Sequence, residues 1–271
     1  MAACGAPPAR LWFAGDVQVE AEPDQALAGL AALRGAGLVN LEGPVLAARP
    51  AGEERLFNHP GVPAALARFG VQAVSLQNNH LDDGGSTGRV ATQAAVAAAG
   101  LAGIERTAVL TVDGQPVSVV VALAGPPEAL AAAVRAAAPP VVVSLHVVAP
   151  PVYLPSPATR AQVEAALAAG AAVVVVHGSH ALAPVERRGR QVVAWGLGNV
   201  AFACACTQED EALALEVTLA PDGVVDATVV PIRAGLHGAP MKLEPEPAGV
   251  FDLLEGMGST PLIRRGARAT F

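Results

Sequence analysis

Apolar runs and alanine-rich segments alternate along residues 11–202 in the rhythm of an α/β protein. Runs that are rich in valine, or that end at polar residues, predict strands at 11–17, 38–43, 72–80, 141–149, 173–177 and 191–202, and Asp-Gly pairs predict hairpins at 108–123 and 211–232. Alanine-rich segments predict helices at 24–37, 60–70, 86–100, 126–140 and 156–170, the third with Ser86 as its N-cap. Because unbroken valine runs are typical of strands buried on both faces, the pattern predicts a layered α/β fold.

The composition narrows the possible functions. The 271 residues carry a net charge of −7 with only 17 Lys and Arg, so the basic surface of a nucleic-acid-binding protein is missing. The apolar runs 117–125 and 141–149 are shorter than the about 20 residues needed to cross a bilayer. The N-terminus lacks the charged start and long apolar run of a secretory signal. We therefore expect a cytoplasmic protein that acts on a small molecule or a peptide, without a nucleic-acid partner or membrane insertion.

The chain has three cysteines, which are too few for a disulfide framework. Cys204 and Cys206 are two residues apart, a spacing that would place both thiols on one face of a strand. They could be two small buried side chains in a reducing compartment or a pair of metal ligands. No second Cys/His pair stands at zinc-finger spacing, so the first interpretation is expected.

Polar residues follow the apolar strands at the point where each strand ends. They are Asp16, Glu42, Asn78 to His80, His146, His177 and His180. A single residue of this kind is most often a turn or cap residue, but ligand sites of open α/β sheets form outside the carboxyl ends of the strands. The joint occurrence therefore predicts one convergent site. Its oxygen and nitrogen donors suit one or two divalent cations such as Mn, Zn, Fe or Mg, and no nucleophile elbow or dinucleotide fingerprint competes with this interpretation.

Six motifs resemble, in order, those of the CapA family, which is named for a poly-γ-glutamate capsule-biosynthesis protein and lies in the calcineurin-like metallophosphatase superfamily. They are FAGD, VNLEGPV, SLQNNHLDDGG, VSLH, AGAAVVVVHGSHALAPVE and GLGNVAF. The resemblance implies a four-layer α/β/β/α sandwich of two mixed sheets. We expect this domain to span residues 1–235, with residues 236–271 as a tail packed on it or extending it.

The resemblance also implies a set of metal ligands at the strand ends. Asp16 and His180 are similar to ligands of one metal, and Glu42 stands where a bridging carboxylate is expected. Asn79 and His146 resemble ligands of a second metal.

The remaining roles implied by the resemblance concern proton transfer and the second metal. His80 resembles the histidine that acts as acid or base, and Asp82 is taken as the aspartate of the usual NH-x-x-D-x-G run after a one-residue shortening, where it would orient His80. Gly178 occupies a position where the superfamily has a ligand histidine, and Gln18 stands where many members have another. These departures predict a weakened second metal site. His177 is expected to have a structural or substrate-facing role, with metal ligation as the alternative.

Three functions are compatible with this site. The first is a metal-dependent hydrolase of a phosphoester or a peptide-like amide, with His80 exchanging a proton. The second is a peptide epimerase, because some relatives in peptide natural-product pathways are epimerases; His80 with His177 or Asp82 would then supply acid and base. The third is a non-catalytic component of an envelope-polymer complex.

Overall fold

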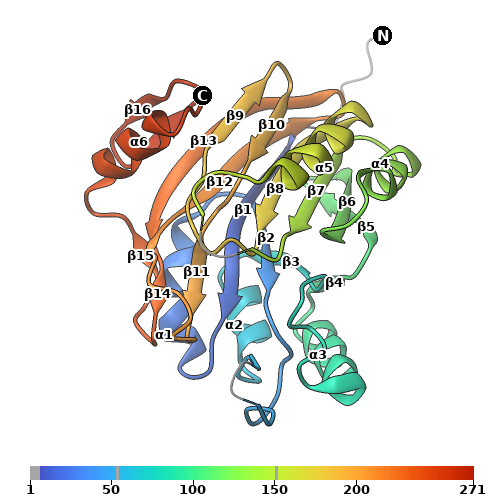
Figure 1. Ribbon diagram of the computed structural model, residues 1–271, viewed down its shortest axis with the longest axis vertical. Helices are drawn as coiled ribbons and strands as arrows, with labels where there is room; N and C mark the ends of the chain where they lie inside the picture. The colour runs from blue at the N-terminus through green and yellow to red at the C-terminus, as the bar shows by residue number, and fades with distance from the viewer. Residues whose placement is uncertain (1–6, 53–54, 150–151) are drawn as a thin grey trace.

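The computed structural model describes residues 7–52, 55–149 and 152–271. The larger of its two sheets has eleven strands (Figure 1). The strands of this sheet are β1 (Ala9–Gln18), β2 (Ala36–Leu41), β3 (Val71–Ser75), β4 (Ala102–Ile104), β11 (Asn199–Phe202), β12 (Glu211–Ala220), β13 (Gly223–Arg233), β14 (Gly235–Leu236), β15 (Lys242–Leu243), β16 (Ile263–Arg265) and β17 (Arg268–Thr270). The order is β16-β17-β13-β12-β1-β2-β3-β4, with β11 paired to β1, β14 to β11 and β15 to β13. Parallel pairing from β1 to β4 and antiparallel pairing around β12 and β13 make this sheet mixed.

A second sheet of six strands faces the first. Its strands are β5 (Thr107–Val112), β6 (Gln115–Leu123), β7 (Val141–His146), β8 (Ala171–His177), β9 (Val185–Arg188) and β10 (Gln191–Ala194), in the order β5-β6-β7-β8-β10-β9. The four central strands are parallel and the two edge strands are antiparallel to their neighbours. The two mixed sheets that the resemblance implies are therefore confirmed.

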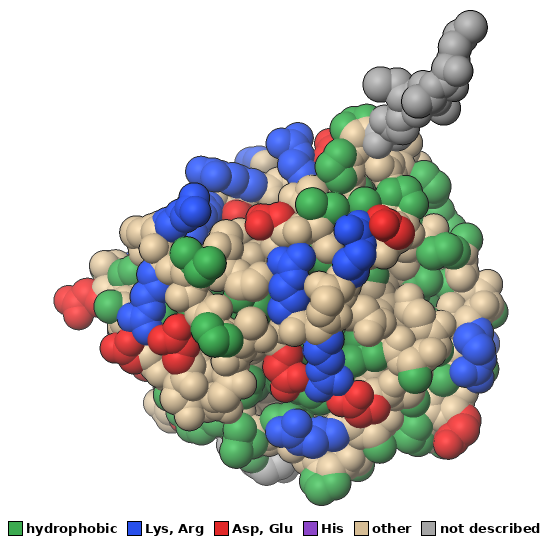
Figure 2. Space-filling model, turned by 90° about the horizontal axis from the view of Figure 1, so that it is seen from above, with side chains coloured by type: hydrophobic (Ala, Val, Ile, Leu, Met, Phe, Trp, Pro, Cys, Tyr) green, Lys and Arg blue, Asp and Glu red, His purple; other side chains and the backbone are tan. Residues whose placement is uncertain are grey.

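The described helices pack on the two sheets, and all but the last cover the outer faces. They are α1 (Pro23–Leu27), which continues as a 3-10 helix (Ala28–Ala32), α2 (Val62–Arg68), α3 (Gly85–Ala98), α4 (Pro127–Ala136), α5 (Pro157–Ala168) and α6 (Pro247–Gly256). The first three pack with the outer face of the eleven-stranded sheet, and α4 and α5 pack with that of the six-stranded sheet (Figure 1). Within the described part of the chain, no helix is both long and apolar enough to cross a membrane. On the face seen in Figure 2, Lys and Arg side chains lie among Asp, Glu and hydrophobic side chains.

The alternation of side chains along each strand separates the layers. Leu11 and Phe13 of β1 lie in the core between the sheets, whereas Trp12 lies in the core beneath α1 to α3. In the same way, Val175 of β8 faces the central core and Val174 faces α4 and α5. Because successive strand residues point to opposite faces, a strand buried on both sides must be apolar throughout. The predicted four-layer α/β/β/α sandwich is confirmed.

The C-terminal segment extends the eleven-stranded sheet. Within it, β14 pairs with β11, β15 and β17 pair with β13, and β16 pairs with β17. Val250 and Phe251 of α6 join the core between the sheets.

Expected elements differ from the observed ones at their ends, and three examples concern the site or its supports. The run 72–80 is a strand only to Ser75, and its polar end forms a turn; the run 24–37 is a short helix and a 3-10 helix before β2. The helix expected at 86–100 begins at Gly85 with Gly84 in the N-cap position, so the prediction of Ser86 as N-cap is wrong.

The run 191–202 is not one strand but two, and it crosses between the sheets. β10 belongs to the six-stranded sheet and β11 to the eleven-stranded one. The crossing passes through Gly198, whose φ of 69° favours glycine and whose carbonyl oxygen accepts a hydrogen bond from Asp16 N at 3.2 Å. This crossing therefore fixes the backbone of Asp16 at the edge where the sheets meet.

Candidate metal centre

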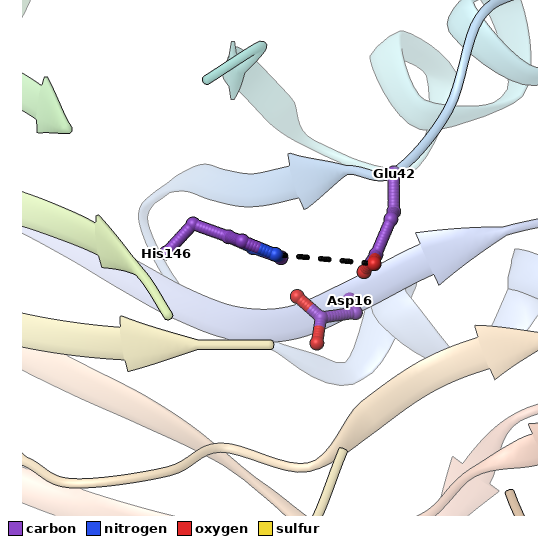
Figure 3. A group of neighbouring side chains, drawn as sticks. All are labelled: Asp16, Glu42 and His146. Carbon is purple, nitrogen blue, oxygen red and sulfur yellow. Dashed lines mark ion pairs between the residues drawn. The ribbon is translucent and has the colours of Figure 1, made fainter. Parts of the chain in front are cut away.

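The carboxyl ends of β1, β2 and β7 bring three ligand types together in the interior. Asp16 lies in β1, Glu42 directly follows β2, and His146 ends β7 of the other sheet. One ligand atom from each lies within 4.8 Å of the others, and all three residues are buried (Figure 3). Two carboxylates and an imidazole are donors that hard and borderline divalent cations accept. The predicted convergence of these strand ends is present in the fold.

Asp16 lies at the middle of the cluster and is surrounded by hydrogen-bond donors. Its Oδ1 accepts from Asn40 Nδ2 at 2.8 Å, and its Oδ2 accepts from Gly178 N at 3.0 Å. His180 Nδ1 lies 3.3 Å from Oδ2, and His177 Nδ1 lies 3.5 Å from Oδ1. Burial by itself would raise the pKa of Asp16, but the two histidines more than offset it and hold this pKa well below its usual value. Asp16 is therefore an anion throughout the neutral range.

Glu42 and His146 face each other with pKa values shifted by burial. His146 Nε2 lies 3.9 Å from Glu42 Oε1 and 2.8 Å from Asn79 Oδ1. Burial, together with the charge of Asp16, raises the pKa of Glu42 well above its usual value. Burial lowers the pKa of His146 to about 4. His146 is thus a neutral imidazole at pH 7, which is the form that binds metals.

His180 reaches the cluster from a loop with an uncommon backbone. Its φ of 51° lies in the left-handed region, which non-glycine residues seldom adopt and which recurs at functional sites. Its Nδ1 lies 3.0 Å from Asn199 Oδ1, its Nε2 lies 3.8 Å from Glu42 Oε1, and its ring packs on Phe202 with centroids 4.7 Å apart. Burial alone would lower the pKa of His180, but Asp16 and Glu42 raise it to about 9.

His177 is buried behind Asp16. Among the described residues its two ring nitrogens have no hydrogen-bond partner, and its side chain has no exposed surface. Buried polar atoms normally have hydrogen-bond partners. A buried imidazole without such partners beside the Asp16 carboxylate therefore fits a site in which a bound ion supplies further contacts. The same burial does not fit the substrate-facing role that was one of the expectations for His177.

Gly178 cannot be replaced by a ligand histidine in this backbone. Its φ is 87°, and a Cβ at this position would lie 2.0 Å from Val147 O and 2.7 Å from His146 Nε2. The chain thus passes too close to β7 for any side chain here, and only its N–H contributes to the site.

His80 lies at the edge of the cluster and is oriented by Asp83, which corrects the assignment of this role to Asp82. His80 Nδ1 lies 2.8 Å from Asp83 Oδ2, and the same oxygen accepts a hydrogen bond from Leu56 N. Asp82 instead pairs with Arg89, and its side chain is 65% exposed. The motif NH-x-x-D-x-G can be read from Asn79 without any shortening, and its aspartate is then Asp83.

Sequence reasoning missed one amide at the centre of the network, Asn40, whereas Asn78 was among the strand-end residues expected at the site. Asn40 Nδ2, which donates to Asp16 Oδ1, also lies 3.4 Å from Glu42 Oε2 and 3.3 Å from His146 Nδ1. Asn78 Nδ2 in turn donates to Asn40 Oδ1 at 3.2 Å and to the Leu41 carbonyl oxygen at 2.9 Å. The period of two along β2 could have revealed Asn40, because it stands two residues before Glu42 and so shares its face.

Gln18 ties loops together instead of facing the cluster. Its Nε2 donates to Phe57 O at 2.7 Å, and its Oε1 accepts from the backbone N–H of Ala203 and of Cys204, each at 2.9 Å. The amide oxygen thus holds the loop after β11, and the amide nitrogen holds the chain at Phe57.

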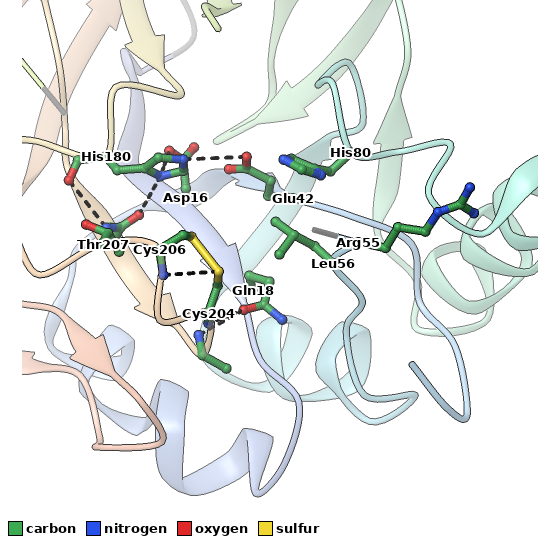
Figure 4. Close-up of a disulfide and its surroundings, with 12 residues drawn as sticks. Asp16, Gln18, Glu42, Arg55, Leu56, His80, His180, Cys204, Cys206 and Thr207 are labelled. Atoms are coloured by element: carbon green, nitrogen blue, oxygen red, sulfur yellow. Dashed lines mark hydrogen bonds and ion pairs between the residues drawn. A yellow bond between two sulfur atoms is a disulfide. The ribbon is translucent and has the colours of Figure 1, made fainter. Parts of the chain in front are cut away.

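Cys204 and Cys206 form a disulfide in that loop (Figure 4). The expectation of two reduced thiols on a buried strand is wrong, because β11 ends at Phe202 and the chain then turns outward. Cys204 is partly exposed and Cys206 is exposed.

The sequence matches a known protein family. Residues 10–203 match the family described as bacterial capsule synthesis protein PGA_cap, a range that contains every candidate site residue. No curated protein matches the chain.

Proposed function

Because the chain belongs to the PGA_cap family of bacterial capsule synthesis proteins, within the metallophosphatase-like superfamily, we propose that it is a metal-dependent hydrolase of a phosphoester or a peptide-like amide. The observation that carries this proposal is the buried cluster of Asp16, Glu42 and His146, whose ligand atoms lie within 4.8 Å of one another.

The donor set fits a divalent ion. Asp16, Glu42 and His146 would hold it, with His180 and Asn79 at its edge. Two neighbouring carboxylates, Asp16 and Glu42, are costly to bury as anions without a cation, and this is the physical reason that the pKa of Glu42 is raised. A bound ion would supply the charge that polarises a phosphoryl or carbonyl oxygen and activates water.

The protein's own contribution to the chemistry is proton transfer at His80. Asp83 Oδ2 accepts from His80 Nδ1 at 2.8 Å, which places the ring proton on Nδ1 and leaves the lone pair of Nε2 for the substrate. The His80 side chain is 24% exposed, so a substrate can reach it, whereas Asp83 is held in place by Leu56 N. This arrangement provides an oriented acid–base group at the mouth of a buried anionic cluster.

The same geometry favours hydrolysis over epimerisation. An epimerase needs a second acid–base group on the opposite face of the stereocentre. The expected candidates are poorly placed for this task, since His177 is fully buried behind Asp16 and Asp82 is paired with Arg89 outside the cluster. One exposed acid–base group beside a cation site is what hydrolysis requires.

The test is elemental analysis of the purified protein, coupled to a screen of phosphoesters and peptides in which products are read by mass and by stereochemistry. We expect bound divalent metal and a product heavier by one water. Asp16→Ala and His180→Ala should lose metal and turnover, while Asp222→Ala, at an exposed carboxylate paired with Arg190, should keep both. Turnover that survives Asp16→Ala, a product of unchanged mass and inverted stereochemistry, or metal binding without turnover on any member of either class would contradict the proposal.

A further inference from the structure

We propose that Cys204 and Cys206 are a reversible thiol–disulfide site that controls the affinity of the neighbouring metal centre; the inference rests on the proposed metal site and adds a control to it. The pair lies in the loop 203–210 between β11 and β12. Cys206 is exposed, so its sulfur is accessible to a thiol from solution. The described ranges contain no other cysteine, because Cys4 lies outside them.

The loop is joined to the metal centre on both sides. Ala203 N and Cys204 N both donate to Gln18 Oε1, and Gln18 stands two residues after Asp16 in the same strand. On the other side, Phe202 directly precedes the loop and packs its ring on His180. Figure 4 draws the disulfide beside Gln18 and below His180. A change in the loop can therefore shift the groups around Asp16 through Gln18 and through the contact of Phe202 with His180.

The far end of the loop is anchored independently of the disulfide. Tyr153 Oη donates to Glu209 Oε2 at 2.8 Å, and Thr207 is buried. With Gln18 holding residues 203 and 204, the segment between these anchors is closed by the sulfur–sulfur bond and by the Cys206 N–H, which donates to Cys204 Sγ at 3.2 Å. A disulfide across one residue removes little entropy from the unfolded chain, so its effect is on the local position of the loop and not on global stability.

The chemistry balances with a dithiol as the reductant. A thiolate of the dithiol attacks Cys206 Sγ, the sulfur–sulfur bond breaks, and Cys204 leaves as a thiolate that takes up a proton. The second thiol of the reductant then attacks the mixed disulfide and releases Cys206. Two electrons and two protons pass to the pair, and the reductant leaves as its own disulfide.

Opening the bond frees Cys204 to leave Gln18 Oε1, which then keeps only the Ala203 N–H as a donor, because Ala203 N is also held by the Gln18 backbone oxygen at 2.9 Å. The loss of a donor from a buried amide oxygen is costly, so the side chain of Gln18 and the adjoining part of β1 must readjust. Changing partners outside the ligand shell typically alters metal affinity or activity by about 10- to 100-fold. We expect a decrease of this size on reduction, because the oxidised loop holds both Gln18 and Phe202 in place.

The experiment compares Mn²⁺ binding by the oxidised and the reduced protein. Mn²⁺ is chosen because thiolates are poor ligands for it, so freed cysteines would not bind it themselves. Dithiothreitol is removed by desalting under argon before the titration, and alkylation followed by intact mass counts the free thiols. We expect one free thiol, Cys4, in the oxidised form and three in the reduced form, with Mn²⁺ affinity about 10- to 100-fold lower after reduction.

Variants separate the parts of the inference. Cys204→Ser with Cys206→Ser should bind Mn²⁺ like the reduced wild type and ignore dithiothreitol, whereas Cys4→Ser should keep the full response. Gln18→Leu should still form the disulfide but lose the difference between the two forms.

Three results would overturn the inference. One is three alkylated thiols after treatment with diamide, and another is Mn²⁺ affinity that agrees within about twofold between the two forms. The third is a Gln18→Leu variant whose Mn²⁺ affinity still falls on reduction as in the wild type, which would show that Gln18 does not link the disulfide to the metal centre. Absence of Mn²⁺ binding in either form would instead contradict the proposed function on which the inference rests.

Discussion

Gly178 provides the sharpest quantitative test of the site, through the substitution Gly178→Ala. Two costs are expected. A non-glycine residue in the left-handed region costs about 1–2 kcal/mol, and Gly178 has a φ of 87°. The added Cβ would also lie 2.0 Å from Val147 O and 2.7 Å from His146 Nε2; forced overpacking of this kind costs typically about 1–3 kcal/mol. The free energy of unfolding should therefore fall by about 2–5 kcal/mol.

Gly238→Ala is the matched control, because Gly238 has the same φ of 87° and no heavy atom within 4 Å of the added Cβ. It carries the backbone cost without the overlap. The difference in Tm between the two variants should correspond to the overlap alone, at about 2–4 °C per kcal/mol for chains of roughly this size. Differential scanning calorimetry measures this difference.

Metal content gives a second readout for the same pair of variants. Gly178→Ala should also lose bound metal, since its Cβ displaces the ring of His146, while Gly238→Ala should retain it. Equal Tm values for the two variants, or full metal content in Gly178→Ala, would refute the claim that the close approach to β7 shapes the site. The same reasoning predicts that Gly178→His destabilises the protein and does not build a second metal site.

Three further predictions concern the polar network. Asn40→Leu should lower metal affinity by about 10- to 100-fold while a melting curve still shows cooperative unfolding; unchanged affinity in calorimetry would mean that Asn40 does not organise the ligands. His80→Ala should keep its metal but lose about 10²–10⁴-fold in kcat. Asp83→Asn should also reduce kcat, whereas Asp82→Asn should not. A loss of kcat in Asp82→Asn but not in Asp83→Asn would mean that Asp82 orients His80, as first expected. In the metal-free protein the pKa of His180 is raised to about 9, so its proton must leave before the ring can bind metal. The affinity for metal should therefore rise with pH up to about pH 9, by up to about tenfold per pH unit. Titrations in buffers of different ionisation enthalpy should show proton release at pH 7 in the wild type and less in His180→Ala; an affinity that is flat from pH 6.5 to 8.5 would exclude this role.

The pKa of His180 also contributes to how the stability of the metal-free protein depends on pH, which denaturant titrations at several pH values measure. The folded pKa of about 9 lies above the usual value of 6.5. The stabilisation from the charged His180 is therefore fully present below about pH 6.5 and is lost as the pH rises through 9.

The pattern of the sequence was sufficient for a layered α/β fold and for the edge at which the site forms, whereas the four layers were implied by the family resemblance. Valine runs such as 173–176 are typical of strands buried on both faces, and the alternation of strands with alanine-rich helices predicts a layered α/β fold. Asp16, Glu42 and His146 could be named because each ends an apolar strand, and parallel strands deliver their carboxyl ends to one edge. These features are local and periodic, so they can be read without knowing which strands are neighbours.

Only the tertiary structure decided how the polar residues divide the work. Asn40 and Glu42 share a face of β2, but only the meeting of the two sheets shows that Asn40 lies between Asp16 and His146. The choice of Asp83 over Asp82 depended on a turn whose geometry brings Leu56 N to the same carboxylate. Likewise, the close passage of Gly178 past Val147 O depends on the register between β7 and β8. Contacts of this kind join residues that are far apart in the chain. Their distances are fixed by packing and by strand register, which the local pattern of a sequence does not specify.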